Sequence, residues 1–216
     1  MNSITTLQLR HMLIAASSAI VENEPLLTQL DQATGDGDHG ACMKLGFSAV
    51  QKMLTETSAF QDSADLLTQV GSVLINAAGG ASGLLFGTLF ISGARKLERK
   101  NEMTGMDWAL FLHAGTEAIQ RRGRAEPGDK TMLDALFPAA DGLYRAASAG
   151  EDLARCLQQA ADCAQKGAEA TKSMRARVGR AWAYADASIG HPDAGAVSSA
   201  ILIASLAHAL IHSPHG

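Results

Sequence analysis

The segment LDQATGDGDHGACMKLGF, residues 30–47, holds three aspartates within eight positions: Asp31, Asp36 and Asp38. Because glycine adopts backbone conformations that other residues avoid, the chain can bend here and bring the carboxylates together. Converging carboxylates repel one another unless a cation neutralises them, and hard oxygen ligands favour Mg²⁺ or Ca²⁺. The EF-hand pattern fails because its last ligand position falls on Phe47, so Mg²⁺ is the favoured ion. From spacing alone, a solvated Asp-Gly turn whose carboxylates cap helices fits equally well.

A second loop, NAAGGASG (76–83), places small residues directly before the apolar stretch LLFGTLF. A glycine-rich turn at a helix N-terminus presents free N–H groups and the positive end of the helix dipole, which suits a phosphate. The Gly-Lys-Ser/Thr of a Walker A loop does not follow. Close packing between helices is the stronger explanation for this loop when it is taken alone.

A third loop, GRAEPGDKTMLDAL (123–136), contains a Pro-Gly turn, and Asp129 or Thr131 fits the cap of the next helix. Lys130 fits either a phosphate contact or an ordinary exposed lysine. Met132 fits either a base pocket or the core.

A fourth loop, VGRAWAYADASIGHPDAGAVSS (178–199), carries Arg180, whose planar fork suits a phosphate. Its GHPDAG segment (190–195) forms a rigid turn before a helix. His191 is expected to be a structural hydrogen-bonding residue, and Asp193 fits a helix cap.

The elements that carry these loops are predicted to be helices, because apolar residues recur with a helical period and no convincing alternating strand is present. Asp62 or Ser63 is expected to cap one helix, and Thr104 or Asp107 to start another. The segment 196–211 is the most apolar, but it is short for a membrane span and is predicted to be a buried core helix. The predicted helices lie near 4–22, 25–33, 40–55, 63–77, 82–99, 106–121, 131–148, 151–175 and 195–212.

The bulk composition predicts a single domain, 1–216, located in the cytoplasm. A net charge of −4 gives no general attraction to nucleic acid or to acidic membranes, so neither is expected as a partner. Three cysteines without paired spacing are expected to be reduced thiols, and the N-terminus has no signal-peptide pattern.

In an up-and-down helical array every second connection falls at the same end, so the four loops can gather at one rim. Acidic metal ligands beside glycine-rich phosphate cradles indicate a magnesium–nucleotide site. Together the four loops make this interpretation stronger than any one of them does.

The four loops together resemble the nucleotide-binding L subunit of dihydroxyacetone kinase. The residues that carry the resemblance are GDGDHG (35–40), GGASG (79–83), EPGDKTMLDAL (126–136) and GRAWAYADASIGHPDAGAVSS (179–199). The resemblance implies an all-α barrel of about eight antiparallel helices. It also implies that ADP or ATP is held at one rim through Mg²⁺, with two ions expected.

The same resemblance implies residue roles. The metal ligands fall on Asp31, Asp36 and Asp38, and these three with Arg180 are expected to act in phosphoryl transfer. The nucleotide contacts fall on His39, Gly40, Ala41, Cys42, Ala81, Ser82, Gly123, Met132, Arg180, Asp193, Ala194 and Gly195. Cys42 is a departure, since the family usually has Asn there, and a thiol beside these carboxylates should resist ionisation.

The implied activity is phosphoryl transfer to dihydroxyacetone that a partner K subunit holds covalently through a histidine. The donor is either exchangeable ATP or a retained ADP that a phosphotransferase-system M subunit rephosphorylates; a separate short subunit favours the second. Another keto-triose or a keto-tetrose such as erythrulose is an alternative acceptor. A non-catalytic nucleotide-binding regulatory module and a plain helical scaffold are competing interpretations.

Overall fold

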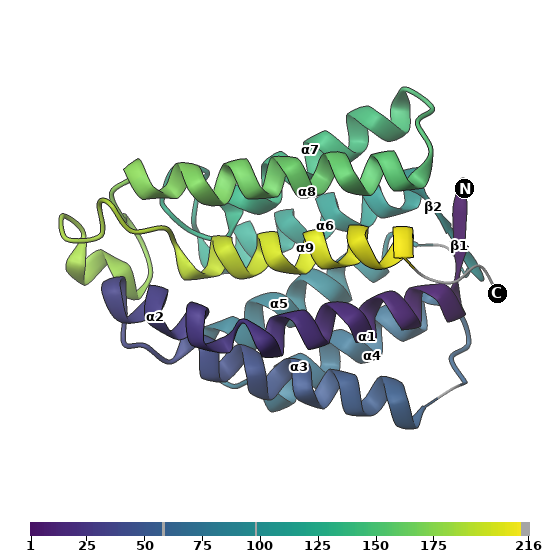
Figure 1. Cartoon of the computed structure of the whole chain (residues 1–216), viewed down its shortest axis with the longest axis horizontal. Coiled ribbons are helices and arrows are strands. Elements are labelled where there is room, and N and C mark those ends of the chain that lie inside the picture. The colour runs from purple at the N-terminus through teal and green to yellow at the C-terminus, as the bar shows by residue number, and fades with distance from the viewer. Residues whose placement is uncertain (58, 98, 213–216) are drawn as a thin grey trace.

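A computed structural model gives the structure of residues 1–57, 59–97 and 99–212. Within these residues the chain forms nine α-helices and two short strands (Figure 1). The prediction of an all-helical fold is confirmed, and residue 98 of the predicted helix 82–99 lies outside the described residues. The helices are α1 (Thr6–Glu22), α2 (Glu24–Thr34), α3 (His39–Glu56), α4 (Ser63–Ala77), α5 (Gly80–Ala94), α6 (Gly105–Gly123), α7 (Leu133–Ser148), α8 (Leu153–Ala170) and α9 (Ala194–His212).

Polar side chains fix where several helices begin. The Asp62 carboxylate accepts the N–H of Asp65 at 2.8 Å, so Asp62 rather than Ser63 caps α4. Thr104 caps α6, and Asp107 completes a capping box by accepting the Thr104 N–H at 2.9 Å. These side chains satisfy amides that a helix leaves without partners in its first turn.

The structure corrects the sequence prediction at three places. The strands β1 (Ser3–Thr5) and β2 (Glu102–Thr104) pair antiparallel, although three residues are too few to show alternation. Helix α5 ends at Ala94 rather than near 99. The N–H groups of Lys96 and Leu97 donate to carbonyls three residues earlier instead of four, which closes the helix with a tighter turn. Helix α8 ends at Ala170 rather than near 175 and continues as the short 3₁₀ helix η1 (Thr171–Ser173), where the Thr171 hydroxyl donates to the Ala168 carbonyl.

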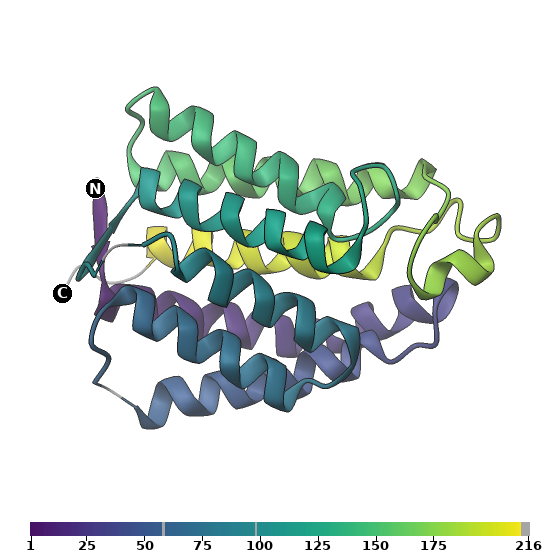
Figure 2. The ribbon, with the colours of Figure 1, turned by 180° about the vertical axis from the view of Figure 1, so that it is seen from behind.

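The long helices contact one another in a closed order. Each packs against the next in the series α1, α3, α4, α5, α6, α7, α8, α9, and α9 packs against α1. Helix α2 extends beyond α1 at one end, while the β1–β2 pair crosses the opposite end (Figures 1 and 2). Neighbours in this closed series run in opposite directions, and α2 continues in the direction of α1. The connections after α2, α4, α6 and α8 therefore meet at the end away from the strands.

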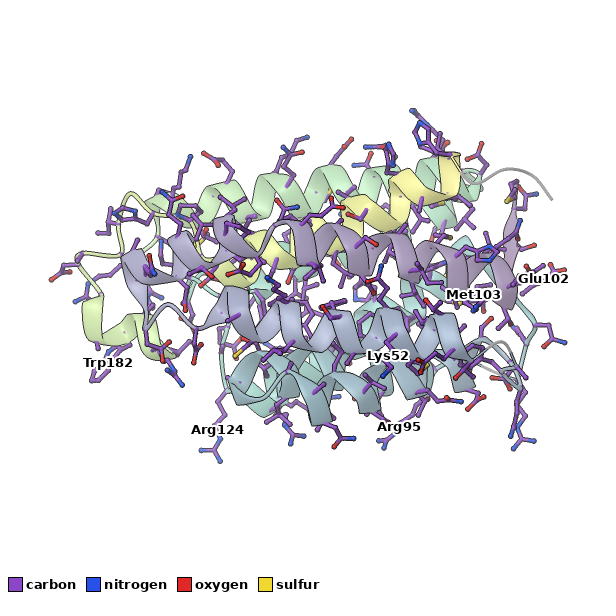
Figure 3. All side chains as sticks on the ribbon, turned by 60° about the horizontal axis from the view of Figure 1, so that its bottom comes forward. Lys52, Arg95, Glu102, Met103, Arg124 and Trp182 are labelled. Atoms are coloured by element: carbon purple, nitrogen blue, oxygen red, sulfur yellow. The ribbon has the colours of Figure 1, made fainter. Side chains whose placement is uncertain are left out.

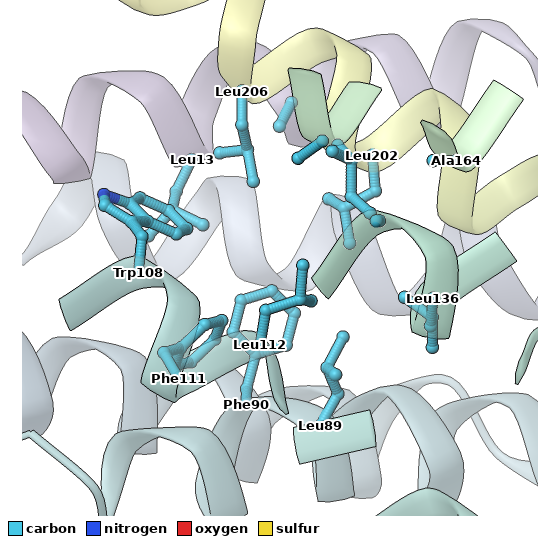
Figure 4. Close-up of a cluster of buried hydrophobic side chains, with 14 of the residues drawn as sticks. Leu13, Leu89, Phe90, Trp108, Phe111, Leu112, Leu136, Ala164, Leu202 and Leu206 are labelled. Atoms are coloured by element: carbon cyan, nitrogen blue, oxygen red, sulfur yellow. The ribbon is translucent and has the colours of Figure 1, made fainter. Parts of the chain in front are cut away.

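Apolar side chains from many of these helices fill one interior (Figure 4). The rings of Phe90 and Phe111 lie 5.9 Å apart, and those of Trp108 and Phe111 lie 5.7 Å apart. Leu202 and Leu206 reach the same cluster from α9. Among the described residues, α9 is the helix long and apolar enough to cross a membrane, with a mean hydropathy of 1.9, and 56% of that apolar window is buried inside the fold.

Glycines allow α4 and α5 to approach closely. A Cβ atom added at Gly87 would lie 2.6 Å from the Gly71 carbonyl oxygen, and one added at Gly71 would lie 2.8 Å from the Gly87 carbonyl oxygen. Backbone atoms cannot move aside as the end of a flexible side chain can. Gly71 and Gly87 therefore serve helix packing, and so does Gly83 of the predicted loop, where an added Cβ would lie 2.8 Å from the Leu74 carbonyl oxygen. An added Cβ at Gly79 meets no atom within 4 Å, so packing explains only part of that loop.

We predict that Gly87→Ala lowers the free energy of unfolding by about 1–3 kcal/mol, because the added methyl overpacks the contact between α4 and α5. Urea denaturation followed by circular dichroism measures the change. Gly123→Ala is the matched control, since an added Cβ there meets no atom within 4 Å. Its stability should be unchanged or slightly raised, and an equal loss in both variants would contradict the packing argument.

Candidate functional site

A pocket of about 190 Å³ lies where the four loops meet. Most of the residues that the sequence assigned to a site line this pocket: Asp31, Asp36, Asp38, His39, Cys42, Ala81, Ser82, Met132, Arg180, Asp193, Ala194 and Gly195. The described lining also includes residues that the sequence did not assign, among them the apolar side chains of Leu85, Phe86 and Val178. The pocket therefore has a charged side and an apolar side.

The three aspartates converge on the charged side of the pocket. One carboxylate oxygen from each of Asp31, Asp36 and Asp38 lies within 4.8 Å of the other two. The bend that brings them together starts where the Gly35 N–H donates to the Asp31 carbonyl at 2.5 Å, and it passes through Gly37, which has a φ of +77°. Only glycine adopts that conformation without a steric cost.

Arg180 supplies positive charge beside these carboxylates. Its Nη1 atom contacts the Asp36 carboxylate and lies 3.5 Å from Oδ2 of Asp38. All three side chains are partly exposed, so solvent weakens the attraction. The arginine comes from the short 3₁₀ helix η2 (Arg180–Tyr184), far along the chain from the aspartates it meets.

His39 forms the buried base of the pocket and is 7% exposed. Its Nδ1 lies 2.9 Å from the Ser82 hydroxyl and its Nε2 lies 3.0 Å from the Ser198 hydroxyl. Ser198 donates its own proton to the Gly195 carbonyl, so it accepts from Nε2–H, which leaves Nδ1 to accept from Ser82. This neutral imidazole joins α3, α5 and α9. Burial lowers the pKa of His39, and the nearby Asp31 carboxylate opposes that effect.

Two helix N-termini border the pocket. Helix α5 begins at Gly80, directly after Gly79. These two glycines have φ values of +57° and +67°, and the helix starts without a side-chain cap. At α9 the Asp193 carboxylate accepts the Ala196 N–H at 2.7 Å, which confirms the predicted cap. Burial raises the pKa of Asp193 to about 7, although its hydrogen bond to Ala196 and the charge of Lys130 act in the other direction.

The loop before α7 is shaped by its own carboxylates. Asp134 accepts the N–H groups of Gly128 at 2.5 Å and Thr131 at 2.7 Å, and Asp129 accepts the Glu126 N–H at 2.7 Å. Lys130 is 1% exposed, so the expectation of an ordinary exposed lysine is wrong. Met132 is buried and also lines the pocket.

Cys42 lies in the first turn of α3 and lines the pocket. Burial raises the pKa of its thiol, and the charges of Asp38 and Asp31 raise it further. The thiol therefore stays protonated near neutral pH, in the direction that the sequence predicted.

Comparisons with known proteins show the family of this chain. A family model described as the DAK2 domain matches residues 33–208. The PEP-dependent dihydroxyacetone kinase, ADP-binding subunit DhaL, of Escherichia coli (strain K12) is 35% identical over 205 residues, covering 95% of this chain and 97% of that protein. The triokinase/FMN cyclase of Homo sapiens is 37% identical over 193 residues, covering 89% and 33%. The crystal structure of the dihydroxyacetone kinase from C. freundii in complex with AMP-PNP and Mg²⁺ matches with a TM-score of 0.73 and 26% identity, covering 96% and 34%.

The chain belongs to the DAK2 domain family. The matched segment includes most of the helices and the loops that form the pocket, except for Asp31 at the start of the first loop. The chain spans about a third of the length of the human relative and of the solved kinase, and nearly the whole of the E. coli subunit.

In this DAK2 domain three sequence-assigned residues lie outside the described pocket lining: Gly40, Ala41 and Gly123. Gly40 is buried against α2, where a Cβ atom would lie 2.6 Å from the Thr28 amide nitrogen. Ala41 and Gly123 are exposed. Ser198 hydrogen-bonds to His39 at the pocket, but no role was assigned to it from the sequence, although it lies in the motif 179–199. Its place one helical turn beyond Ala194 is the signal that could have assigned it.

We predict that the protein loses stability as the pH falls below about 6.5, the ordinary value for histidine, partly because His39 takes up a proton more readily in the unfolded chain. His39→Gln keeps one donor and one acceptor but cannot titrate, so it should lose less stability between pH 7.5 and 5.5. Urea unfolding at both pH values measures the difference. His11→Gln, on the exposed face of α1, is the control and should follow the parent protein. Equal acid sensitivity in all three proteins would overturn the assignment.

Proposed function

We propose that this DAK2 domain is the nucleotide-binding subunit or domain of a dihydroxyacetone kinase. It would present ADP or ATP, bound through Mg²⁺, to dihydroxyacetone on a partner K subunit. One observation carries the proposal: the carboxylates of Asp31, Asp36 and Asp38 converge in the same pocket as the N-termini of α5 and α9. The ADP-binding DhaL subunit of E. coli and the C. freundii kinase structure in complex with AMP-PNP and Mg²⁺ support it.

The residues of the pocket fit such a ligand. Three carboxylates form an oxygen donor set that suits Mg²⁺ shared with phosphate oxygens. Bound Mg²⁺ would neutralise phosphate charge during transfer. The first turns of α5 and α9 would give N–H groups to the phosphates from Ala81, Ser82, Ala194 and Gly195. The apolar side chains of Leu85, Phe86, Met132 and Val178 suit a base.

Arg180 has a defined role in this proposal. It now pairs with the carboxylates of Asp36 and Asp38. Once cations hold those aspartates, its planar fork would turn to a phosphate oxygen and stabilise charge there. We assign no general base in this chain, because the acceptor hydroxyl would belong to the partner's site.

The arrangement of the molecule is part of the proposal. The closed order of helix contacts supports a barrel of eight helices with the nucleotide at one rim. A single buried apolar cluster supports one domain over residues 1–216. We also propose a cytoplasmic location, as expected for a kinase subunit that uses intracellular nucleotides.

The donor has two candidate forms. The E. coli relative, which this chain matches over 97% of its length, is the ADP-binding subunit of a PEP-dependent kinase. It favours a retained ADP and a PEP-dependent system, with an M subunit as the second partner. The human relative contains a matching segment within a longer triokinase, which favours exchangeable ATP and leaves another keto-triose as an acceptor. A regulatory module that binds nucleotide without catalysis is the remaining alternative.

We predict that the purified protein releases ADP when it is denatured and chromatographed, and that a chelator removes the ADP beforehand. Asp36→Ala should weaken nucleotide binding roughly tenfold or more and abolish kinase activity in a mixture with the K subunit. Asp162→Ala, at a half-buried residue of α8 that does not line this pocket, is the control and should behave like the parent protein.

The outcomes separate the alternatives. ADP that survives dialysis favours the PEP-dependent form, whereas an empty protein that binds ATP reversibly favours the exchange form. Binding without activity in the presence of the K subunit favours the regulatory module. An unchanged Asp36→Ala variant would remove the metal assignment, and no binding by the parent protein with Mg²⁺ would remove the nucleotide proposal.

We predict that Cys42→Asn slows the release of nucleotide about twofold to tenfold, because the amide adds one hydrogen bond that a thiol makes poorly. Stopped-flow displacement of a fluorescent ADP analogue measures the release rate. Cys42→Ala separates the gain of the amide from the loss of the thiol. If Asn and Ala give the same rate, position 42 makes no such bond.

A further inference from the structure

Lys130 is a buried cation that lines the same pocket but lies outside the carboxylate cluster. Its ammonium group donates to the carbonyl oxygens of Thr171 and His191, each at 2.5 Å. A buried charge is costly unless it is hydrogen-bonded and compensated. The two carbonyls supply the hydrogen bonds, and the carboxylates of Asp134 and Asp193 supply negative charge nearby.

The two carbonyls belong to opposite ends of one segment, residues 171–193. This rim loop connects α8 to α9 and carries η2 at its tip. Further bonds close the same neck: the Asp193 N–H donates to the Thr171 hydroxyl at 2.9 Å, and the Gly190 N–H donates to the Lys172 carbonyl at 2.7 Å. Lys130 ties this neck to the loop before α7, and Arg177 adds a second tie further along the rim loop, where its N–H donates to the Asp129 carbonyl at 3.2 Å.

The backbone at Lys130 adds a second observation. Its φ is +64°, in the left-handed region that side chains other than glycine adopt at a cost. Glycine would relieve that cost, yet a lysine stands there with its side chain completely enclosed. The hydrogen bonds from Gly128 and Thr131 to Asp134 hold the flanking backbone in this shape.

Beyond the neck, the rim loop reaches the pocket. Arg180 lies at its tip against Asp36 and Asp38, and Asp193 ends it at the cap of α9. Trp182, two residues beyond Arg180, is 64% exposed and projects from this end of the molecule (Figure 3). The loop beyond the neck holds its own shape through the pair of Arg175 with Asp186 at 2.6 Å and through the buried Ser188 hydroxyl, which accepts the Ala176 N–H at 3.1 Å. The neck therefore helps to set where the tip lies.

We propose that Lys130 is a positioning residue that clamps the neck of the rim loop and thereby holds Arg180 at the carboxylate cluster. The clamp itself is a property of the fold, and its effect on ligand binding rests on the proposed function. Without the ammonium group, the carbonyls of Thr171 and His191 lose a common partner. The contacts of Arg177 with Asp129 then remain as the tie between the rim loop and the loop before α7, and Arg180 is held less firmly beside the aspartates.

The first test uses the protein without added nucleotide and measures amide hydrogen exchange. Lys130→Met should raise the exchange rate of residues 174–189 at least tenfold, while the amides of α4 stay protected. Lys172→Met is the matched control, because it removes an exposed lysine of the same loop that pairs with Glu169 at 2.6 Å. Its exchange should equal that of the parent protein. Unchanged protection of the rim loop in Lys130→Met would overturn the clamp.

The second test measures binding of ADP with Mg²⁺ by calorimetry. Lys130→Met should weaken binding roughly tenfold, and Lys130→Gln, which keeps one donor and also serves if the Met variant does not fold, should weaken it less. In an Arg180→Gln background the same substitution should cost much less, because the two residues act through one path. Equal losses in both backgrounds would overturn the positioning role. If the parent protein binds no ADP but the exchange difference persists, the proposed function fails and the clamp stands.

Discussion

The repulsion among three carboxylates is the constraint on which the pocket depends. Asp31, Asp36 and Asp38 lie within 4.8 Å of one another in a short, partly exposed turn, so positive charge has to come from elsewhere. In the structure that charge comes from Arg180. Holding an arginine there requires a long loop with a fixed neck, and the neck requires a buried lysine from another connection. The chemistry of one turn therefore determines contacts across three loops of the rim.

The helix array makes such contacts available at one end only. Because successive helices alternate in direction, the connections after α2, α4, α6 and α8 meet there, although they are far apart in the sequence. The wall built on His39 is rigid, since its ring joins α3, α5 and α9. The facing rim loop has an exposed tip, and it is anchored at its neck and through the Arg177 N–H, which donates to the Asp129 carbonyl. The pocket thus combines one fixed side with one side that can adapt.

Much of the fold could be predicted from local sequence, because helical periodicity, capping residues and glycine turns depend on residues that are close together in the chain. The helices and the caps at Asp62 and Thr104 came from such signals, whereas the assigned pocket-lining residues came mainly from the resemblance of the four loops to a known family. The rest depends on contacts between distant segments. The burial of Lys130, the pairing of Ser198 with His39 and the short strands at Ile4 and Met103 each need a partner that no local pattern reveals. Gly40 shows the opposite error, since a motif position serves helix packing.

The strand pair has a consequence for how this domain can be joined to others. Met1 and the end of α9 lie beside β1 and β2, at the end of the array away from the pocket (Figure 1). Relatives such as the human protein carry a matching segment within a chain about three times as long. A linker attached at either terminus therefore leaves the opposite end, which carries the pocket, uncovered. Covalent fusion and free association with a partner are therefore compatible with the same exposed pocket, and the architecture permits both modes of assembly without rebuilding the site.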